Sequence, residues 1–450
     1  MGSVPTTEIP PEAARLVNRY YVYAGVYTLA ASIIWGINTL FLLDAGLSIS
    51  EVFIANAAFS VGTMVFEIPT GVIADTVGRR ASFLLSLVVL ALTTLLYVWL
   101  SNLRAGVVAF SVVSVLMGLG FTFYSGAMEA WLVDGARELG FEGGFDRVFS
   151  RGQFISGAAM LTGTVGGGLI GQINLAWPFI VRAALLMILF VLAYGGMQDV
   201  GFEPRRVPLR QVHREAIRVG RDGVRFGWGH RSLRLLMVGA AVQSGFFIWA
   251  WYAWQPYFLE LLNDDAVWVA GVVAALLAIS MMIGNSVVEV VTKWCGRRTT
   301  LLLWSGGIFS LGMIGVGLVN AFWPALALLF LSGVAIGVQM PVRQAFVHQI
   351  VPSEQRATVV SFDSMVSGSG GVVGQTGLGA LAERSGYSAG YILGGLATVV
   401  AVPIVMLVRR RRDKEDFFEG SDPARRGACA AEGLPAIAAV KGRVPEYVDT

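Results

Sequence analysis

Among the ionisable side chains that lie inside long apolar stretches of this 450-residue chain, five stand out as candidates for a chemical role. They are Glu67, Glu129, Arg151, Arg343 and Asp363. A charge at the centre of a bilayer costs about 2.5–3.5 kcal/mol on insertion scales, so such residues usually serve a function. A carboxyl group that is partly removed from water suits proton binding, because burial disfavours its charged form. Glu67 and Glu129, and after them Asp363, are therefore our candidates for a proton-binding group.

Polar and aromatic side chains in the same stretches are candidates for the lining of a binding cavity. They are Trp35, Asn38, Gln243, Trp249, Tyr252, Asn285 and Gln339. Aromatic faces with few fixed charges suit large apolar or cationic ligands, through stacking and cation–π contacts. The alternative is an interfacial belt, since tryptophan and tyrosine gather at membrane surfaces. We expect the belt for Trp254 and Tyr257.

Several other chemistries are excluded by the residue types present. None of the three lysines has the glycine before it and the serine or threonine after it that a phosphate-binding P-loop needs. His213, His230 and His348 are too far apart for a helical His-Glu-x-x-His zinc site. Cys295 and Cys429 make no disulfide framework. We therefore expect that the protein is not an enzyme and that it binds no metal and no cofactor.

The composition is that of a membrane protein with many spans. Hydrophobic residues make up 55% of the chain and charged residues 14%, against roughly 45–50% and about 25% in soluble domains. The mean hydropathy is +0.66. A chain this apolar cannot cover its apolar surface and still present a soluble exterior. The first residues show no signal peptide, so we expect the first span itself to direct insertion.

Twelve apolar segments are long enough to cross a bilayer, which requires about 20 residues each. Their approximate ranges are 20–43, 51–74, 81–100, 106–134, 150–173, 177–197, 233–257, 267–292, 299–318, 323–347, 357–382 and 389–408. The sequence therefore predicts an all-α integral membrane protein with twelve transmembrane helices.

The placement of arginine and lysine predicts the orientation. The loops assigned to the outside contain only two basic residues, Arg104 and Arg384. The opposite loops are rich in arginine, and so are residues 198–232 and the stretch that begins at Arg409. By the positive-inside rule, both termini and the central segment face the cytoplasm. We expect a multi-pass protein of a bacterial-type inner (plasma) membrane.

The chain divides around its basic central segment. We expect a cytoplasmic N-terminal segment (1–19), an N-terminal six-helix half (20–197), a cytoplasmic linker (198–232), a C-terminal six-helix half (233–408) and a disordered cytoplasmic tail (409–450). In the linker, arginines recur every three or four residues from Arg210 to Arg225. This spacing predicts an amphipathic helix on the anionic inner leaflet. A regulatory or partner-binding role is the alternative, and we expect no nucleic-acid partner.

Two sets of matching positions indicate that the halves are related. Gly78, Arg79 and Arg80 recur 218 residues later as Gly296, Arg297 and Arg298. Four glycines of the fifth segment recur 211 residues later in the eleventh segment. The pairs are Gly157 and Gly368, Gly163 and Gly374, Gly166 and Gly377, and Gly168 and Gly379. Two six-span halves related by an axis along the membrane normal are a known transporter plan.

The loop after the second segment contains Gly71, Asp75, Gly78, Arg79 and Arg80. Its pattern of glycine, three residues, aspartate, two residues, glycine and two basic residues resembles the signature loop of the major facilitator superfamily. Glycine permits a tight turn, and the arginines can pair with acids at helix ends. The resemblance implies the major facilitator fold, with this loop as a latch that holds the cytoplasmic side closed in the outward-open state.

Other stretches resemble bacterial superfamily members that are grouped with drug exporters. They are Phe66–Gly71, Ser125–Trp131 and Pro352–Thr358. Two positions depart from the exporter pattern: Ser114 replaces the arginine often found in proton-coupled members, and Thr164 replaces the proline of the antiporter motif.

The resemblance also implies that spans four and five face spans ten and eleven. Glu129, Arg151, Arg343 and Asp363 would then form alternating charge pairs across the cytoplasmic gate, which close in the outward-open state and break in the inward-open state. The alternative is that such charges reach water or pair locally, as Asp134 could with Arg79 or Arg80.

The favoured interpretation is a monomeric secondary active transporter that exports small amphipathic or cationic compounds in exchange for protons by alternating access. A transporter of a defined metabolite, such as a sugar, amino acid or siderophore, is the alternative. A membrane sensor or enzyme on the same scaffold is the remaining class.

Overall fold

The computed structural model describes residues 10–202, 221, 224–351, 356–411 and 416–418. In this part of the chain the regular structure is helical, apart from one isolated bridge between Arg297 and Phe417. The central residues from Arg210 to Arg218, for which we expect an amphipathic linker helix, lie outside the described residues, as does most of the predicted tail.

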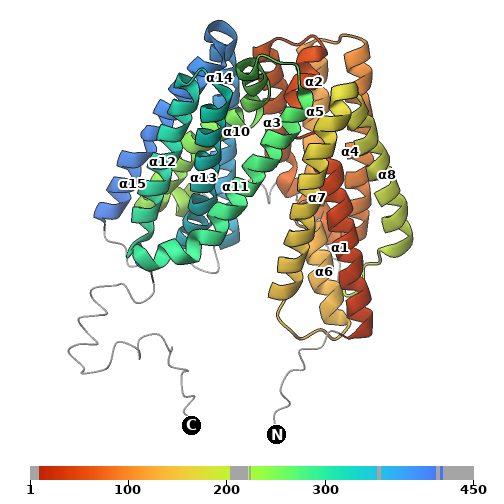
Figure 1. The fold of residues 1–450 in the computed structure, drawn as a ribbon. Coiled ribbons are helices and arrows are strands. Elements are labelled where there is room, and N and C mark those ends of the chain that lie inside the picture. Colours follow the sequence, from red (N-terminus) through yellow and green to blue (C-terminus); the bar gives the residue numbers. More distant parts are fainter. Residues whose placement is uncertain (1–9, 203–220, 222–223, 352–355, 412–415, 419–450) are drawn as a thin grey trace, which may run out of the picture.

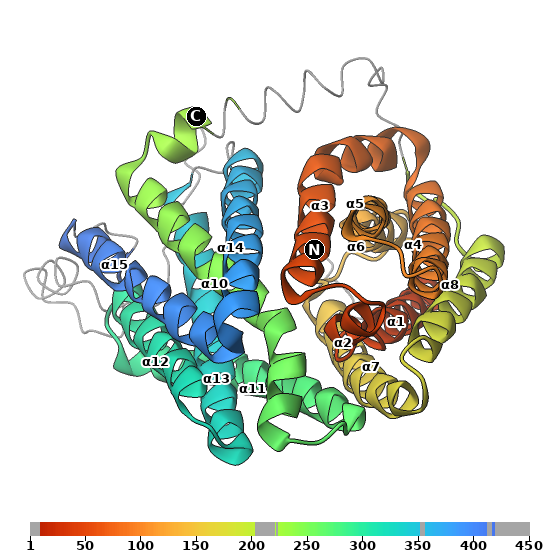
Figure 2. The same ribbon diagram turned by 90° about the horizontal axis from the view of Figure 1, so that it is seen from above.

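The helices form two groups that stand side by side (Figures 1 and 2). The first group contains α1 (Pro11–Ser32), α2 (Asn38–Asp44), α3 (Ile49–Val77), α4 (Arg79–Asn102), α5 (Val107–Tyr124), α6 (Ala127–Glu138), α7 (Asp146–Ile173) and α8 (Trp177–Gly196). The second group contains the π-helix η2 (Val224–Trp228), α10 (Arg231–Leu262), α11 (Val267–Trp294), α12 (Arg298–Leu318), α13 (Phe322–Ile350), α14 (Arg356–Val399) and α15 (Ala401–Arg410).

The two ends of the molecule are called the base and the top. The base is the end at which α1, α4, α10 and α12 begin, and the top is the opposite end, where α2 finishes and α14 turns (Figure 1). The groups meet where α3 packs against α14 and where α7 packs against α11. The first group has one apolar core, centred on α1, α4 and α8. The second group has two apolar clusters around α10, α12 and α13, and one of them also includes Phe53 of α3.

Ten helices of the described chain are long and apolar enough to cross a membrane. The tenth runs for 52 residues from Val359 to Arg410 and reverses at Gly386, whose φ of 81° is left-handed. The tyrosine-rich α1, which stops before α2, is not among the ten. The described part of the chain is therefore helical, with the long apolar helices of a membrane protein.

Two of the predicted segments are interrupted. The predicted segment 106–134 breaks between α5 and α6 at Gly126, which has a left-handed φ of 76°. The predicted segment 20–43 breaks between Ser32 and Asn38, where Gly36 lies against the backbone of Gly271 in the other group. A side chain at this position would push the two backbones apart.

Gln255 of α10 bonds the backbone that this second break exposes. Its Oε1 accepts a hydrogen bond from the Thr39 backbone N–H at 2.8 Å, and its Nε2 donates to the Trp35 carbonyl at 2.8 Å. Gln255 is fully buried. Because an unpaired backbone group within a membrane costs several kcal/mol, this side chain makes the break tolerable and ties the two groups together near the top.

Candidate functional site

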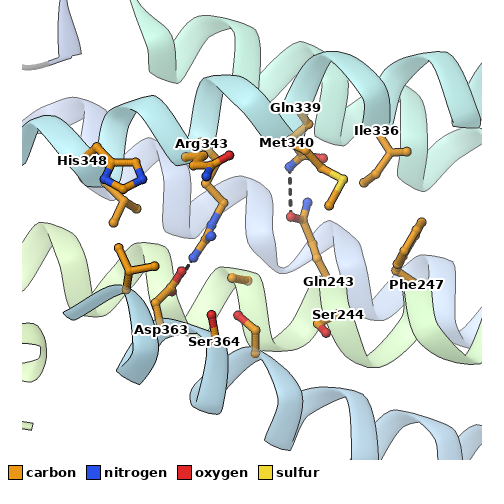
Figure 3. A pocket seen from close by; sticks show the side chains of 15 residues that line it. Gln243, Ser244, Phe247, Ile336, Gln339, Met340, Arg343, His348, Asp363 and Ser364 are labelled. Carbon is orange, nitrogen blue, oxygen red and sulfur yellow. Dashed lines mark hydrogen bonds and ion pairs between the residues drawn. The ribbon is translucent and has the colours of Figure 1, made fainter. Parts of the chain in front are cut away.

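A cavity of about 350 Å³ lies within the second group, in its lower half, among α10, α13 and α14. We call it the second-group cavity; Figure 3 shows its lining. Arg343 of α13 donates to Asp363 Oδ1 of α14 at 2.5 Å, and Gln339 Nε2 donates to Gln243 Oε1 of α10 at 2.9 Å. The cavity thus presents one ion pair and one amide pair on a wall that mixes apolar side chains with further polar ones, among them Ser244, Gln344 and His348.

A larger cavity of about 730 Å³ is lined from both groups, and we call it the shared cavity. The first group contributes Tyr20, Tyr124 and Glu129 from α1, α5 and α6, and the second contributes Met282 and Asn285 from α11. Its walls combine aromatic rings, methionine side chains, several hydroxyl and amide groups and one exposed carboxylate. Such a surface suits an amphipathic cation, because the rings offer cation–π contacts and methionine adapts to irregular shapes.

The candidate residues for proton binding occupy three different settings. Glu129 lines the shared cavity, and Asp363 is paired in the second-group cavity. Glu67, on α3 two residues before Pro69, is an exposed side chain that accepts a hydrogen bond from Ser125 Oγ at 3.4 Å. The structure does not bring the three together, so each is a separate candidate.

The four expected gate charges do not pair across the groups in this structure. Arg343 and Asp363 pair with each other inside the second group. The Arg151 guanidinium stacks on the Tyr21 ring at 5.5 Å, within the first group. Glu129 makes no ion pair with any described residue. The pairing seen here is therefore local.

Three of the aromatic and amide candidates line the two cavities, and the other four do not. Gln243, Gln339 and Asn285 line the two cavities. Asn38 instead donates to Asn56 Oδ1 at 3.0 Å, inside the first group. Trp35 lies edge-on to Trp251, with ring centroids 6.4 Å apart.

Trp249 departs from the expectation that it lines a cavity. It is fully buried and packs against the rings of Phe53, Phe246 and Tyr391. Trp249 is therefore a core residue between α3 and α10 and lines neither cavity. Its large ring contributes to packing there.

The signature loop forms a compact set of contacts at the base. Gly78 has φ 128°, a conformation that only glycine adopts readily. Arg79 pairs with Asp75 at 2.6 Å and reaches Asp134 of α6 at 3.9 Å. The Arg80 backbone N–H donates to Asp199 Oδ1 at 2.9 Å, and its side chain donates to the Tyr194 carbonyl at 2.9 Å. At Gly71, by contrast, an added Cβ would meet no atom within 4 Å.

The top is held closed by contacts between the groups. Besides the Gln255 bonds, Glu383 Oε2 accepts hydrogen bonds from the Ser50 backbone N–H at 2.9 Å and from Ser48 Oγ at 3.3 Å. Ser48 is also the N-cap of α3. A carboxylate at the N-terminus of a helix is favoured by the helix dipole, so Glu383 stabilises the closed top.

Comparison with known proteins places this geometry in a family. The family model described as Major Facilitator Superfamily matches residues 21–294 and 270–441. The chain belongs to the Major Facilitator Superfamily. This superfamily consists of transporters. The membership was predicted from the resemblance of the signature loop.

The relatives agree with the family. The chain is 19% identical over 399 residues to the uncharacterized MFS-type transporter YxaM of Bacillus subtilis, covering 86% of this chain and 94% of the relative. It is 24% identical over 381 residues to the multidrug efflux pump Tap of Mycolicibacterium fortuitum, covering 80% and 88%. The crystal structure of the nucleoside transporter NupG aligns with a TM-score of 0.71 at 12% identity, covering 88% and 99%, which shows the shared fold.

One buried charge was missed by the sequence analysis. Arg182 of α8 is only 7% exposed and lies on the inward face of its helix with Phe179, Ala183 and Leu186. A charged residue well inside the apolar segment 177–197 was the available signal. The same criterion that selected Glu67 and Glu129 would have selected Arg182, because intramembrane arginine is equally costly.

Proposed function

We propose that this protein is a secondary active transporter that works by alternating access and exports small amphipathic or cationic compounds in exchange for protons. The observation that carries the proposal is the shared cavity, which both helix groups line and into which Glu129 projects a carboxylate. A cavity between two groups joined at one end can change the side to which it opens when the groups rock.

The proposal includes the membrane topology. Taking α1 with α2 as one span and dividing Val359–Arg410 at Gly386 gives twelve spans, six in each group. The glycine pairs support two related halves. Gly157 and Gly368 each face a methionine of the other group, Met282 and Met64. With the arginine-rich base on the cytoplasmic side, the contacts at the top correspond to a state that is closed to the outside.

The proposed coupling follows from the same cavity. A carboxylate that binds a proton from one side and a cationic ligand from the other can exchange the two, since both compete for its negative charge. Glu129 is the first candidate for this role because it alone of the three acids lines the shared cavity. Glu67 and Asp363 remain the second and third.

Transport in proteoliposomes tests the proposal. Purified protein would be reconstituted, a proton gradient imposed with the lumen acidic, and the movement of a fluorescent lipophilic cation followed. We expect protein molecules whose base faces the outside of the vesicle to accumulate the dye in the lumen when the gradient is present. We expect this accumulation to be lost in Glu129→Gln. Glu142→Gln, in an exposed position of the α6–α7 connection, is the matched control. Dye movement that ignores the gradient would contradict proton exchange.

A second candidate function is transport of a polar metabolite. It is favoured by the amide pair and ion pair in the second-group cavity, which offer directed hydrogen bonds rather than aromatic faces. Binding of sugars or nucleosides measured by thermal stabilisation, lost in Gln243→Leu and retained in Glu129→Gln, would favour this candidate over export of amphipathic cations.

A further inference from the structure

Arg182 is a buried cation that has no ion-pair partner among the residues the structure describes. Within the described chain no carboxylate pairs with it, and its Nε is buried without a hydrogen-bond partner. Among the described residues, the phenols of Tyr27, Tyr97 and Tyr252 are the ionisable groups near Arg182. We call these four residues the arginine–tyrosine cluster.

Other arginines of the same chain show what a structural role looks like. Arg19 donates to the Gly196 carbonyl at 2.6 Å, and Arg104 donates to the Asp44 carbonyl at 2.6 Å. Each ties a helix end to a neighbouring helix or turn while remaining at the surface. Arg182 makes no such bond to any described residue although it is far more buried, so holding these helices together does not account for it.

The surroundings of Arg182 connect it to both the shared cavity and the second group. Tyr27 stacks on Tyr124, a wall residue of the shared cavity, with ring centroids 3.5 Å apart. Tyr97 shares a hydroxyl hydrogen bond with Ser114. Tyr252, unlike the other three members of the cluster, belongs to α10 of the second group, next to the Thr39 contact at the closed top.

We infer that Arg182 is the binding group for a small monovalent anion, either an inorganic ion or the carboxylate of a transported compound. A guanidinium in a low-dielectric setting binds an anion through charge-assisted hydrogen bonds, which are about twice as strong as neutral ones. The phenols of Tyr27 and Tyr97 are donors that would complete the shell of such an anion. The shared cavity, with its carboxylate, has the opposite preference, so this is a separate site.

Access to the site depends on the proposed alternating access. The groups must part at the top in the other state, and Tyr252 then moves away with α10 while Arg182 stays with α8. The guanidinium is thereby uncovered toward the top. An anion that binds there stabilises the state open at the top, and its release accompanies the return of Tyr252.

Thermal stability in defined salts tests the inference on the full-length purified protein. Chloride or benzoate would replace a bulky sulfonate in steps at constant ionic strength. The sulfonate serves as the reference anion because it does not fit a buried site. We expect the wild-type melting temperature to rise by about 2 °C or more at saturation. The rise should be absent in Arg182→Gln, reduced in Arg182→Lys and unchanged in Arg137→Gln, an exposed arginine near the end of α6.

Each outcome decides between sources or overturns the site. A response to chloride but not benzoate identifies an inorganic anion, and the reverse identifies a carboxylate. No anion-specific rise in wild type overturns the inference even if Arg182→Gln fails to fold, and a rise that persists in Arg182→Gln places the anion elsewhere. If the rise depends on Arg182 while dye transport is absent, the anion site stands and the proposed export does not.

Discussion

Asp199 and Asp416 cap the starts of two helices in the same way. Asp199 follows α8 and accepts a hydrogen bond from the Arg80 backbone N–H at 2.9 Å, near the start of α4. Asp416 follows α15 and accepts one from the Thr299 backbone N–H at 2.8 Å, near the start of α12. In both groups the residues after the final helix thus return to the glycine–arginine–arginine turn, where a carboxylate satisfies an orphan helix donor.

The cap at Asp416 is reinforced by its neighbours. The Arg298 side chain donates to the Phe417 carbonyl at 2.6 Å, and Arg297 stacks on the Phe417 ring at 4.5 Å. Asp416 itself is 1% exposed. Asp416–Phe418 lies within the predicted tail 409–450, so the contacts of the second group extend beyond the boundary expected from sequence.

Replacing Asp416 with alanine should therefore destabilise the second group. Two hydrogen bonds to Thr299 are lost, and we expect a cost of about 1–2 kcal/mol. Differential scanning fluorimetry on purified protein measures the effect, with Asp264→Ala in the exposed α10–α11 connection as the control. An unchanged melting temperature in Asp416→Ala would show that this segment does not hold α12.

The turn at Gly78 should tolerate no side chain. With φ at 128°, alanine is strained, and its Cβ would also collide with the Asp199 carboxylate that caps α4. We expect Gly78→Ala to cost about 1–3 kcal/mol and to reduce transport. Gly71→Ala, where a Cβ has open space, is the matched control. Equal stability of the two variants, measured by thermal unfolding, would contradict this account of the loop.

Gln255 should hold the top closed through the helix break. Gln255→Leu keeps the volume but leaves the Trp35 carbonyl and the Thr39 N–H without partners, at about 1–3 kcal/mol each. Because these bonds cross between groups, the loss should shift the population toward the state open at the top. Distances between spin labels at the top of α2 and α10 measure this shift. Gln344→Leu, an exposed wall residue of the second-group cavity, controls for removal of a glutamine.

The pair of Arg343 and Asp363 should behave as a unit. Asp363→Asn leaves the Arg343 guanidinium without its acid beside the cavity, and Arg343→Gln leaves the carboxylate alone, so each single change should impair transport. The reversed pair, Arg343→Asp with Asp363→Arg, should recover part of the activity. If the reversed pair transports no better than the single variants, the two charges act separately. This is the result expected if each charge pairs with a residue of the first group at a cytoplasmic gate.

The sequence predicted much of this structure because its strongest signals are long apolar segments and a glycine-dependent turn. The base contacts of Arg79 with Asp75 and Asp134 follow from residue types near helix ends. The break after Ser32 was not predictable, because Gln255, which satisfies it, lies more than two hundred residues away in the chain. Trp249 was misjudged for a related reason: composition cannot distinguish a ring in a cavity wall from one in a core.

The internal repeat makes its own prediction, because equivalent glycines have equivalent surroundings. At Gly163 and Gly374 a Cβ would collide with the neighbouring helix of the same group, α1 or α10, whereas at Gly166 and Gly377 it would meet nothing within 4 Å. Alanine is better than glycine inside a helix by roughly 0.5–1 kcal/mol where space is free. Gly166→Ala and Gly377→Ala should therefore raise the melting temperature slightly.

Gly374→Ala should lower the melting temperature instead, because its Cβ would meet the backbone of Gly245 rather than a flexible side chain. Gly163→Ala should lower it less, since the first atom met is the hydroxyl of Ser32, which can rotate, although the Leu29 carbonyl is also close. The same order of effects in both groups is what two related halves require. A reversal in one group, with Gly377→Ala the more damaging of its pair, would show that the matching spacing does not reflect matching packing.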